Sequence, residues 1–227
     1  MHLPISKCLL NVHTPSCKQK YHQQLDSQKT YAVRHGYRYD SVSLPKEDPG
    51  QAKWHKIECL SERLDAYDAV LLLDADCHVR EDAPDICSEI SEGKLIYMTR
   101  GHSGRFNSGV ILTLGADESK RFFQEVLASR GRPLAPEDFV SSEGENGHII
   151  ALARDPLFSG FIQELDYKWN NNRFPDKVDY IRHFSGGPMK EYFRARAIPV
   201  RHLTLSTLSK IEWRGISDQL RALFGKR

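Results

Sequence analysis

The chain has 227 residues, of which 40% are hydrophobic, so it can bury the core of one large domain. Its 32 basic and 30 acidic residues give a net charge of +2, a balance that argues against nucleic-acid phosphates as a standing partner. No apolar run reaches the roughly 18 to 20 residues that span a bilayer, and the start of the chain lacks the apolar centre of a signal peptide, so we expect a soluble cytoplasmic protein.

The first part of the chain reads as alternating strands and helices. Ser6 to Val12 predicts a strand, and a polar helix follows that ends at Gly36. Tyr37 to Leu44 is rich in aromatic and β-branched residues and predicts a second strand. A helix that begins near Trp54 then has an apolar stripe with three- and four-residue spacing. The stripe consists of Trp54, Ile57, Leu60 and Leu64.

A continuous apolar run, Ala69 to Leu73, follows this helix and ends at Asp74. Such a run is typical of a strand that is covered on both faces. Open α/β sheets bind ligands outside the carboxyl ends of their strands. Asp74 and Asp76 are therefore predicted at a position where ligands bind.

The α/β alternation continues beyond these carboxylates. Leu95 to Thr99 and Val110 to Leu114 predict strands, Glu118 to Arg130 an amphipathic helix, and Arg132 to Gly147 a long loop. A short apolar helix is expected at Ile149 to Ala153.

We predict one α/β domain over residues 1–227, with a C-terminal helix at about 207–224 that packs on it. Basic side chains in and after this helix leave a second interpretation open, contact with an anionic membrane surface. They are Arg221, Lys226 and Arg227.

The five cysteines are odd in number and scattered, without the CxxC spacing typical of zinc or redox sites. We interpret them as reduced thiols. They are Cys8, Cys17, Cys59, Cys77 and Cys87.

The triplet Asp74-Ala75-Asp76 has the chemistry of a cation site. Two carboxylates one residue apart can converge on Mn²⁺ or Mg²⁺, which prefer oxygen ligands and complete their shells with phosphate oxygens and water. A solvated turn is the structural alternative. His183 follows a short predicted strand and could supply a third ligand as a neutral imidazole, although a lone histidine is usually structural.

A glycine pair follows His183 closely. Gly186 and its neighbour Gly187 would let backbone N–H groups approach a diphosphate, and Lys190 adds a cation within one helical turn. Together with His183, these residues are interpreted as a diphosphate clamp.

Several motifs in consistent order, over about Leu9 to Tyr192, resemble retaining glycosyltransferases of the GT-A type. The nearest groups are the glycogenin-like and lipopolysaccharide galactosyl- and glucosyltransferases, and the Golgi galactosyl-, mannosyl- and xylosyltransferases. The motifs are Asp74-Ala75-Asp76, Phe106-Asn107-Ser108-Gly109-Val110, Trp169-Asn170 and His183-Phe184-Ser185-Gly186-Gly187-Pro188-Met189-Lys190.

The resemblance implies a fold, a donor and an acceptor. The fold would be the GT-A nucleotide-diphospho-sugar transferase fold, a single mixed, mostly parallel sheet flanked by helices. The enzyme would use Mn²⁺ or Mg²⁺ and move a hexose or pentose from a nucleotide-sugar, with UDP the expected nucleotide, to a saccharide or other hydroxyl acceptor. The anomeric configuration would be retained.

The resemblance also assigns roles by position. Asp74, Asp76 and His183 would bind the metal. The donor would contact Lys56, Ala75, Asn107, Ser108, Gly186 and Lys190, together with the two aspartates. Glu145 and Asn146, which stand where the glycogenin-like pattern has Asp-Gln, are the predicted catalytic pair, with Glu145 facing the donor sugar. Glu191-Tyr192 replaces the Pro-Trp of that pattern, which leaves acceptor closure open.

Three other functions share parts of this pattern. A haloacid-dehalogenase-type phosphatase also uses D-x-D after a strand, but this chain has His78 where Thr or Val is usual. A sugar-nucleotide pyrophosphorylase needs a glycine-rich loop after its first strand, and Asn11 to Pro15 contains no glycine. A non-catalytic nucleotide-sugar or glycan-binding protein stays open, because it would keep the pocket.

Overall fold

The structure, a computed structural model, describes residues 6–140 and 144–197. The chain divides into two units, Met1–Tyr192 and Phe193–Arg227. The second contributes only the end of helix α7 (Pro188–Ala197) to the described residues. The helix predicted at about 207–224 lies outside them, so its packing and the single-domain prediction stay predictions.

A six-stranded mixed sheet forms the centre of the first unit, in the order β2-β1-β3-β6-β5-β7. Only β6 runs antiparallel to its neighbours; the remaining pairs, β1 with β2, β1 with β3 and β5 with β7, are parallel. The strands are β1 (Lys7–His13), β2 (Arg38–Ser43), β3 (Ala69–Leu73), β5 (Ile96–Arg100), β6 (Phe106–Leu114) and β7 (Ile162–Glu164). The predicted mixed, mostly parallel sheet is confirmed.

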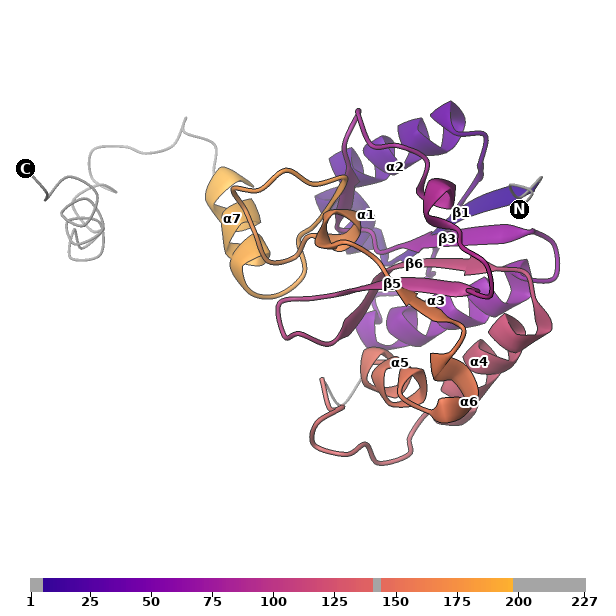
Figure 1. Ribbon diagram of the computed structural model, residues 1–227. Coiled ribbons are helices and arrows are strands. Elements are labelled where there is room, and N and C mark those ends of the chain that lie inside the picture. Colours follow the sequence, from indigo (N-terminus) through magenta and orange to yellow (C-terminus); the bar gives the residue numbers. More distant parts are fainter. Residues whose placement is uncertain (1–5, 141–143, 198–227) are drawn as a thin grey trace, which may run out of the picture. The chain divides into compact units, whose positions relative to one another are not determined.

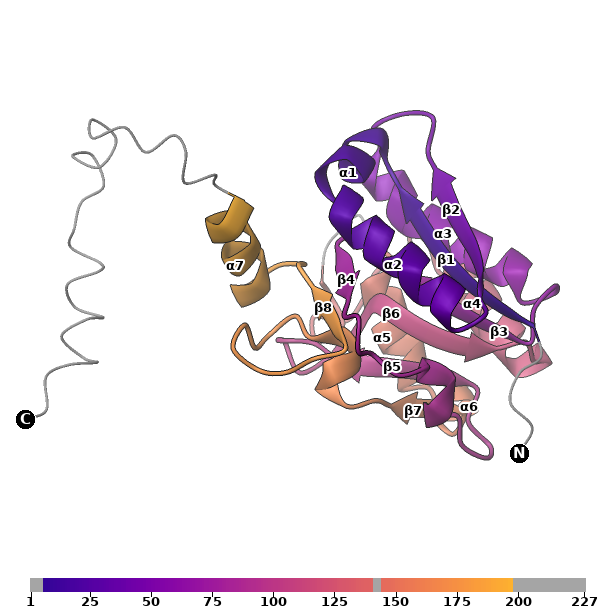
Figure 2. The same ribbon diagram turned by 90° about the horizontal axis from the view of Figure 1, so that it is seen from above.

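Helices cover both faces of this sheet (Figures 1 and 2). Successive side chains of a strand point to opposite faces, so Leu10 and Leu72 pack in one core while Leu9 and Leu71 pack in the other. The first core is closed by α3 (Pro49–Arg63), α4 (Asp117–Ala128), α5 (Asn146–Ala153) and α6 (Pro156–Ser159). The second is closed by α2 (His22–Arg34) and the segments after β3 and β7.

Two helix boundaries differ from the predictions. The first helix is two, α1 (Pro15–Lys20) and α2, because Tyr21 leaves helical geometry with φ −112° and ψ 27°. Helix α3 begins at Pro49 rather than near Trp54. Asp48 is its N-cap and accepts a 2.8 Å hydrogen bond from the Gln51 N–H, while proline suits the first helical position. The predicted apolar stripe of α3 is confirmed as buried.

The sequence predicted only one strand of a second, two-stranded sheet. It pairs β4 (Cys77–Val79) with β8 (Ile181–His183) in antiparallel register, and only β8 was predicted. Two 3₁₀ helices, η1 (Ile86–Glu89) and η2 (Tyr167–Asn170), lie in the connections.

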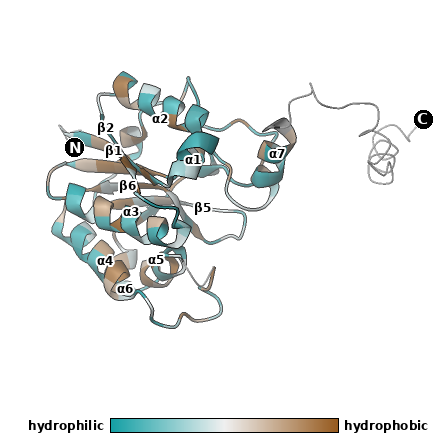
Figure 3. Cartoon of the chain, turned by 180° about the vertical axis from the view of Figure 1, so that it is seen from behind, coloured by the Kyte–Doolittle hydropathy of each residue, from teal (hydrophilic) through white to brown (hydrophobic). Residues whose placement is uncertain are grey.

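The hydropathy of the unit follows these layers (Figure 3). The central strands are hydrophobic, and the helices turn their hydrophilic sides outward. Among the described residues, no helix combines the length and apolarity needed to traverse a bilayer. All five cysteines are free thiols, as the sequence predicted.

Candidate active site

The Asp74-Ala75-Asp76 turn leaves the carboxyl end of β3 and is fixed by backbone contacts. The Asp74 N–H donates to the Gly109 carbonyl at 2.8 Å, and the Cys77 N–H donates to the Asp74 carbonyl at 3.0 Å. The buried amide of Gln28, from α2, donates to the carbonyls of Asp74 and Cys77 at 2.9 and 2.8 Å. The turn is therefore rigid before any ligand binds.

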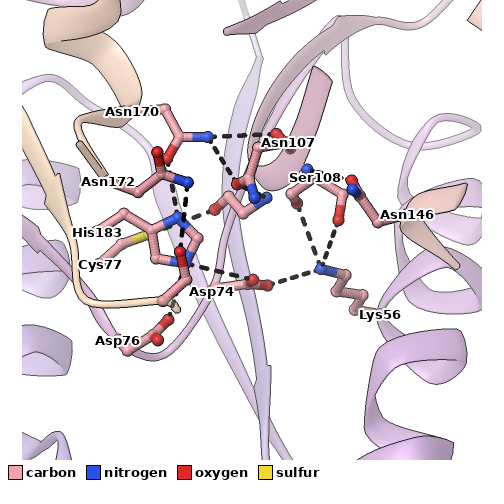
Figure 4. A network of polar contacts seen from close by, with 12 residues as sticks. Lys56, Asp74, Asp76, Cys77, Asn107, Ser108, Asn146, Asn170, Asn172 and His183 are labelled. Carbon is pink, nitrogen blue, oxygen red and sulfur yellow. Dashed lines mark hydrogen bonds and ion pairs between the residues drawn. The ribbon is translucent and has the colours of Figure 1, made fainter. Parts of the chain in front are cut away.

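Pairing of β4 with β8 brings His183 to this turn. The His183 Nε2 atom lies 3.2 Å from an Asp76 carboxylate oxygen and 3.8 Å from an Asp74 oxygen. The Phe184 N–H also donates to the Asp76 carbonyl at 3.1 Å. The three predicted metal ligands thus converge, although the sequence separates them widely (Figure 4).

The Asn170 side chain fixes the tautomer of the neutral histidine ring. Its amide nitrogen donates to the Asn107 carbonyl and side-chain oxygens, so its oxygen is the acceptor for His183 Nδ1, 2.9 Å away. The Nδ1 atom therefore carries the hydrogen, which leaves a lone pair on Nε2 of the neutral ring. That Nε2 atom is buried and has no hydrogen-bond partner among the described residues.

A buried lysine ties the other side of the site together. Lys56 Nζ lies 2.8 Å from an Asp74 oxygen and 2.8 Å from a Glu145 oxygen. It also lies 3.3 Å from both the carbonyl and the hydroxyl oxygen of Ser108. The Lys56 and Glu145 side chains are only 7% and 3% exposed, so this pair is almost fully withdrawn from water.

The start of β6 supplies the remaining predicted residues. Ser108 Oγ donates to Glu145 at 2.6 Å, and the Ser108 N–H donates to the Asn146 side chain at 2.8 Å. Asn107 accepts from the Gly109 N–H at 3.0 Å and from Asn170. Figure 4 shows these side chains joined into one network that runs from Asn170 to Lys56.

The charges shift the pKa values of the convergent groups in different directions. Burial raises the pKa of Asp74, although Lys56 and His183 oppose it. Burial acts the same way on Asp76, but the charge of His183 holds the pKa of Asp76 below its ordinary value. Burial alone would lower the pKa of His183, yet the carboxylates of Asp76 and Asp74 raise it.

These residues fit a divalent cation. Two carboxylates and an unpartnered imidazole nitrogen point into one place, and this nitrogen-and-oxygen donor set suits Mn²⁺. The sequence predictions did not include Cys77 as a ligand, yet the ligand atoms of Asp76, Cys77 and His183 all lie within 4.8 Å of one another. The sequence feature that could have indicated Cys77 is that it directly follows Asp76.

A cavity of about 250 Å³ adjoins the turn. The carboxyl end of β1, α1 and the first turns of α3 line it on one side, and the Asp74-Ala75-Asp76 turn closes it on the other. His13, Thr14 and Lys53 place polar groups in its wall, and the buried Ala75 takes part in the lining. A ligand in this cavity would therefore lie beside the carboxylates of Asp74 and Asp76.

The predicted clamp residues follow β8 in the chain, after His183. Gly186 and Lys190 are exposed, and Lys190 lies in the first turn of α7. In the part of the chain that the structure describes, no hydrogen bond or ion pair joins Lys190 to the site carboxylates. Their role in binding a diphosphate stays a prediction.

The Trp169-Asn170 motif lies inside the protein. Trp169 is fully buried in the second core and donates to Glu89 at 3.1 Å. Asn170 is buried too and bonds to His183 and Asn107. Gln28 was missed, because the sequence marks it only as one polar residue of a polar helix.

No family model matches the chain, and no curated protein matches it in sequence. Solved structures do match. The chain is similar to a glycosyltransferase involved in the glycosylation of the major capsid of PBCV-1, with a TM-score of 0.59 and 17% identity over 83% of this chain and 98% of that chain. It is also similar to the glycosyltransferase GlyE of Streptococcus pneumoniae TIGR4, with a TM-score of 0.55 and 15% identity over 86% of this chain and 61% of GlyE.

A third similar structure is the WbbM bifunctional glycosyltransferase, with a TM-score of 0.52 and 12% identity over 80% of this chain and 46% of WbbM. The chain thus spans less than two thirds of GlyE and of WbbM. At these identities the likeness establishes the fold: the predicted GT-A glycosyltransferase fold is confirmed.

Proposed function

We propose that this chain is a metal-dependent glycosyltransferase that moves a sugar from a nucleotide-sugar to a hydroxyl acceptor. The observation that carries the proposal is the convergence of Asp74, Asp76 and His183 beside a cavity at the carboxyl ends of β1 and β3. The fold shared with known glycosyltransferases supports the same reading.

The donor would bind across the cavity and the turn. The nucleoside would occupy the cavity lined by His13 and Thr14, and the diphosphate would lie against Asp74, Ala75 and Asp76. A bound Mn²⁺ or Mg²⁺ supplies Lewis-acid stabilisation of the charge that builds on a departing diphosphate. UDP is the proposed nucleotide because the resembling families mostly use it.

The residues of this chain would share the work around that cation. Asn170 holds the His183 ring so that Nε2 faces the two carboxylates. Gly186 and Lys190 would contact the phosphates, since backbone N–H groups and an ammonium group are phosphate ligands. The network as a whole is preorganised, which favours stabilisation of charge in the transition state.

The sugar would lie on the side of Asn107, Ser108, Glu145 and Asn146. Glu145 is held by Lys56 and Ser108, so its charge is compensated and its position is fixed. We propose transfer with retention of anomeric configuration, in which the departing phosphate oxygen takes the proton of the acceptor hydroxyl on the same face. This route needs no protein group as general base.

A thermal-shift screen of nucleotide-sugars with and without Mn²⁺ tests donor binding. At a donor concentration of about 100 Kd, a ligand of the folded state adds about 2.7 kcal/mol, or about 5 to 11 °C for a domain of this size. We expect the largest shift with a UDP-sugar plus Mn²⁺ and none with the same donor in a chelator. No shift with any nucleotide-sugar and metal would overturn the proposal.

A turnover assay distinguishes the proposed transferase from a non-catalytic nucleotide-sugar-binding protein. Release of nucleoside diphosphate from the stabilising donor, in the presence of Mn²⁺ and a saccharide acceptor, supports a transferase. Binding without release, and without hydrolysis on long incubation, would assign the site to a nucleotide-sugar-binding protein.

A further inference from the structure

Cys77 lies opposite His183 across the two-stranded sheet. The two residues are register partners in the antiparallel pair of β4 with β8. Directly opposite residues of such a pair carry their side chains on the same face, with Cβ atoms about 4.5 to 5.5 Å apart. The pairing that brings His183 to the aspartates therefore brings a buried thiol there too, as Figure 4 shows.

The donor atoms of Asp76, Cys77 and His183 are close enough to share one ion, since they lie within 4.8 Å of one another. The His183 Nε2 atom is the independent sign of a ligand: the residue is 1% exposed, and Nε2 makes no hydrogen bond among the described residues, only the 3.2 Å ion-pair contact with Asp76 that a shared cation would replace. The thiol donates a hydrogen bond to the Gly109 carbonyl at 3.4 Å, and because a thiol is a weak donor, turning it toward an ion gives up little.

We propose that Asp76, Cys77 and His183 form a mixed oxygen, sulfur and nitrogen site that binds a thiophilic divalent cation of the zinc class. In open, catalytic-type sites Zn²⁺ takes three protein ligands and a water, and thiolate donors favour it over hard cations. On binding, the S–H bond of Cys77 breaks, a sulfur–metal bond forms, and the proton leaves to the buffer.

This inference rests on the proposed function, because it takes over the proposal that a cation binds at His183. Asp74 stays paired with Lys56 and is not needed for the thiophilic ion. A hard cation would use Asp74, Asp76 and His183, whereas a zinc-class ion would use Cys77 in place of Asp74. The two ligand sets share two residues, so the two ions exclude each other. Zn²⁺ should therefore displace Mn²⁺ and block its use.

Cobalt binding tests the thiolate directly. We would titrate Co²⁺ into the wild-type protein and the variants Cys77→Ala, Cys77→Ser, Cys59→Ala and Asp76→Ala. Cys59 is the matched control, because it is a buried thiol beside a histidine, 3.5 Å from His55, but lies on α3 outside the cluster. Cys77→Ser can still donate to the Gly109 carbonyl, so it carries the test if the alanine variant does not fold.

We expect a thiolate-to-cobalt charge-transfer band in the wild-type protein and in Cys59→Ala, and no band in either Cys77 variant. Zn²⁺ affinity, measured by competition with Co²⁺, should fall about tenfold or more in the Cys77 variants. Mn²⁺ affinity should stay unchanged in the same variants.

Two failures are distinguishable. If Co²⁺ binding depends on Asp76 but gives no charge-transfer band, or a band that survives in Cys77→Ser, the thiolate ligand is refuted and the proposed function stands. If Co²⁺ binds equally well to wild type and Asp76→Ala, the cation site itself is wrong and both proposals fall.

Discussion

The His183 ring occupies the space where a side chain on Gly109 would begin. A Cβ atom built on Gly109 would lie 2.1 Å from His183 Cε1 and within 2.9 Å of both ring nitrogens. The Gly109 carbonyl also accepts a hydrogen bond from the Asp74 N–H, so Gly109 lies beside both the His183 ring and the Asp74 turn. The glycine of the Asn107-Ser108-Gly109 motif is therefore required by the position of the ring.

We predict that Gly109→Ala displaces His183. Overpacking of this kind costs about 1 to 3 kcal/mol of unfolding free energy, and Mn²⁺ affinity should fall about tenfold or more because the ring no longer faces Asp76. Chemical denaturation and a Mn²⁺-dependent thermal shift measure the two effects. Gly160→Ala is the control, because its Cβ meets nothing within 4 Å. Equal Mn²⁺ binding in the two variants would contradict the prediction.

Asp76→Ala is expected to abolish metal-dependent donor binding and transfer while the fold stays intact. The turn is held by backbone groups and Gln28, so the carboxylate belongs to the site and not to the scaffold. Donor-induced thermal shifts with and without Mn²⁺ check this, beside circular dichroism. Asp82→Ala, at an exposed aspartate, is the control. Normal turnover of Asp76→Ala would refute the assignment of Asp76 as a metal ligand.

Lys56→Met should destabilise the protein strongly. It leaves the carboxylates of Asp74 and Glu145 without their shared cation in a largely buried place, and loss of one partner of a buried pair costs about 3 to 5 kcal/mol. Urea unfolding measures the loss. Lys29→Met, at an exposed lysine, should be nearly neutral.

A second substitution isolates the charge effect at Lys56. Adding Glu145→Gln to Lys56→Met removes one of the two uncompensated carboxylates, so part of the stability should return. A double variant that is less stable than Lys56→Met alone would show that the lysine acts by packing rather than by charge.

The metal-free protein should lose stability as the pH rises above 6.5. The pKa of His183 is raised in the folded state from 6.5, so the folded protein holds its proton more tightly than the unfolded chain. This contribution is full below pH 6.5 and is lost as the pH rises through the folded pKa. Unfolding free energies across this window should fall with pH in wild type and fall less in His183→Gln.

A saturating cation reverses this dependence. Mn²⁺ binds the unprotonated imidazole, so the stabilisation that Mn²⁺ gives should grow as the pH rises through the same window. If Mn²⁺ stabilises equally across it, His183 does not bind the cation.

Local patterns in the sequence were enough for much of the fold. The β3 strand and the stripe on α3 were predicted because each is a continuous run or a regular period, and such patterns need no knowledge of distant residues. The position of Asp74 at the carboxyl end of a buried strand followed from the same run. The resemblance in motif order added the GT-A fold, which is confirmed, and the site residues, whose roles stay predictions.

The pairing in the small sheet could not be predicted in the same way. Strand β8 was predicted, but β4 has only three residues, too few to display a period, and the two strands lie far apart in the chain. The break between α1 and α2 at Tyr21 was missed for a related reason, since no proline or glycine marks it.

The sequence by itself determined the α/β alternation and the two carboxylates at the end of β3, because strand and helix formation depend on neighbouring residues. Only the tertiary structure decided which side chains those carboxylates meet. The pairing of β4 with β8 sets His183 and Cys77 beside Asp76. The packing of α3 against β1 and β3, and of α5 against β6, sets Lys56 between Asp74 and Glu145. These contacts join segments distant in sequence, and their geometry arises from burial of the whole sheet.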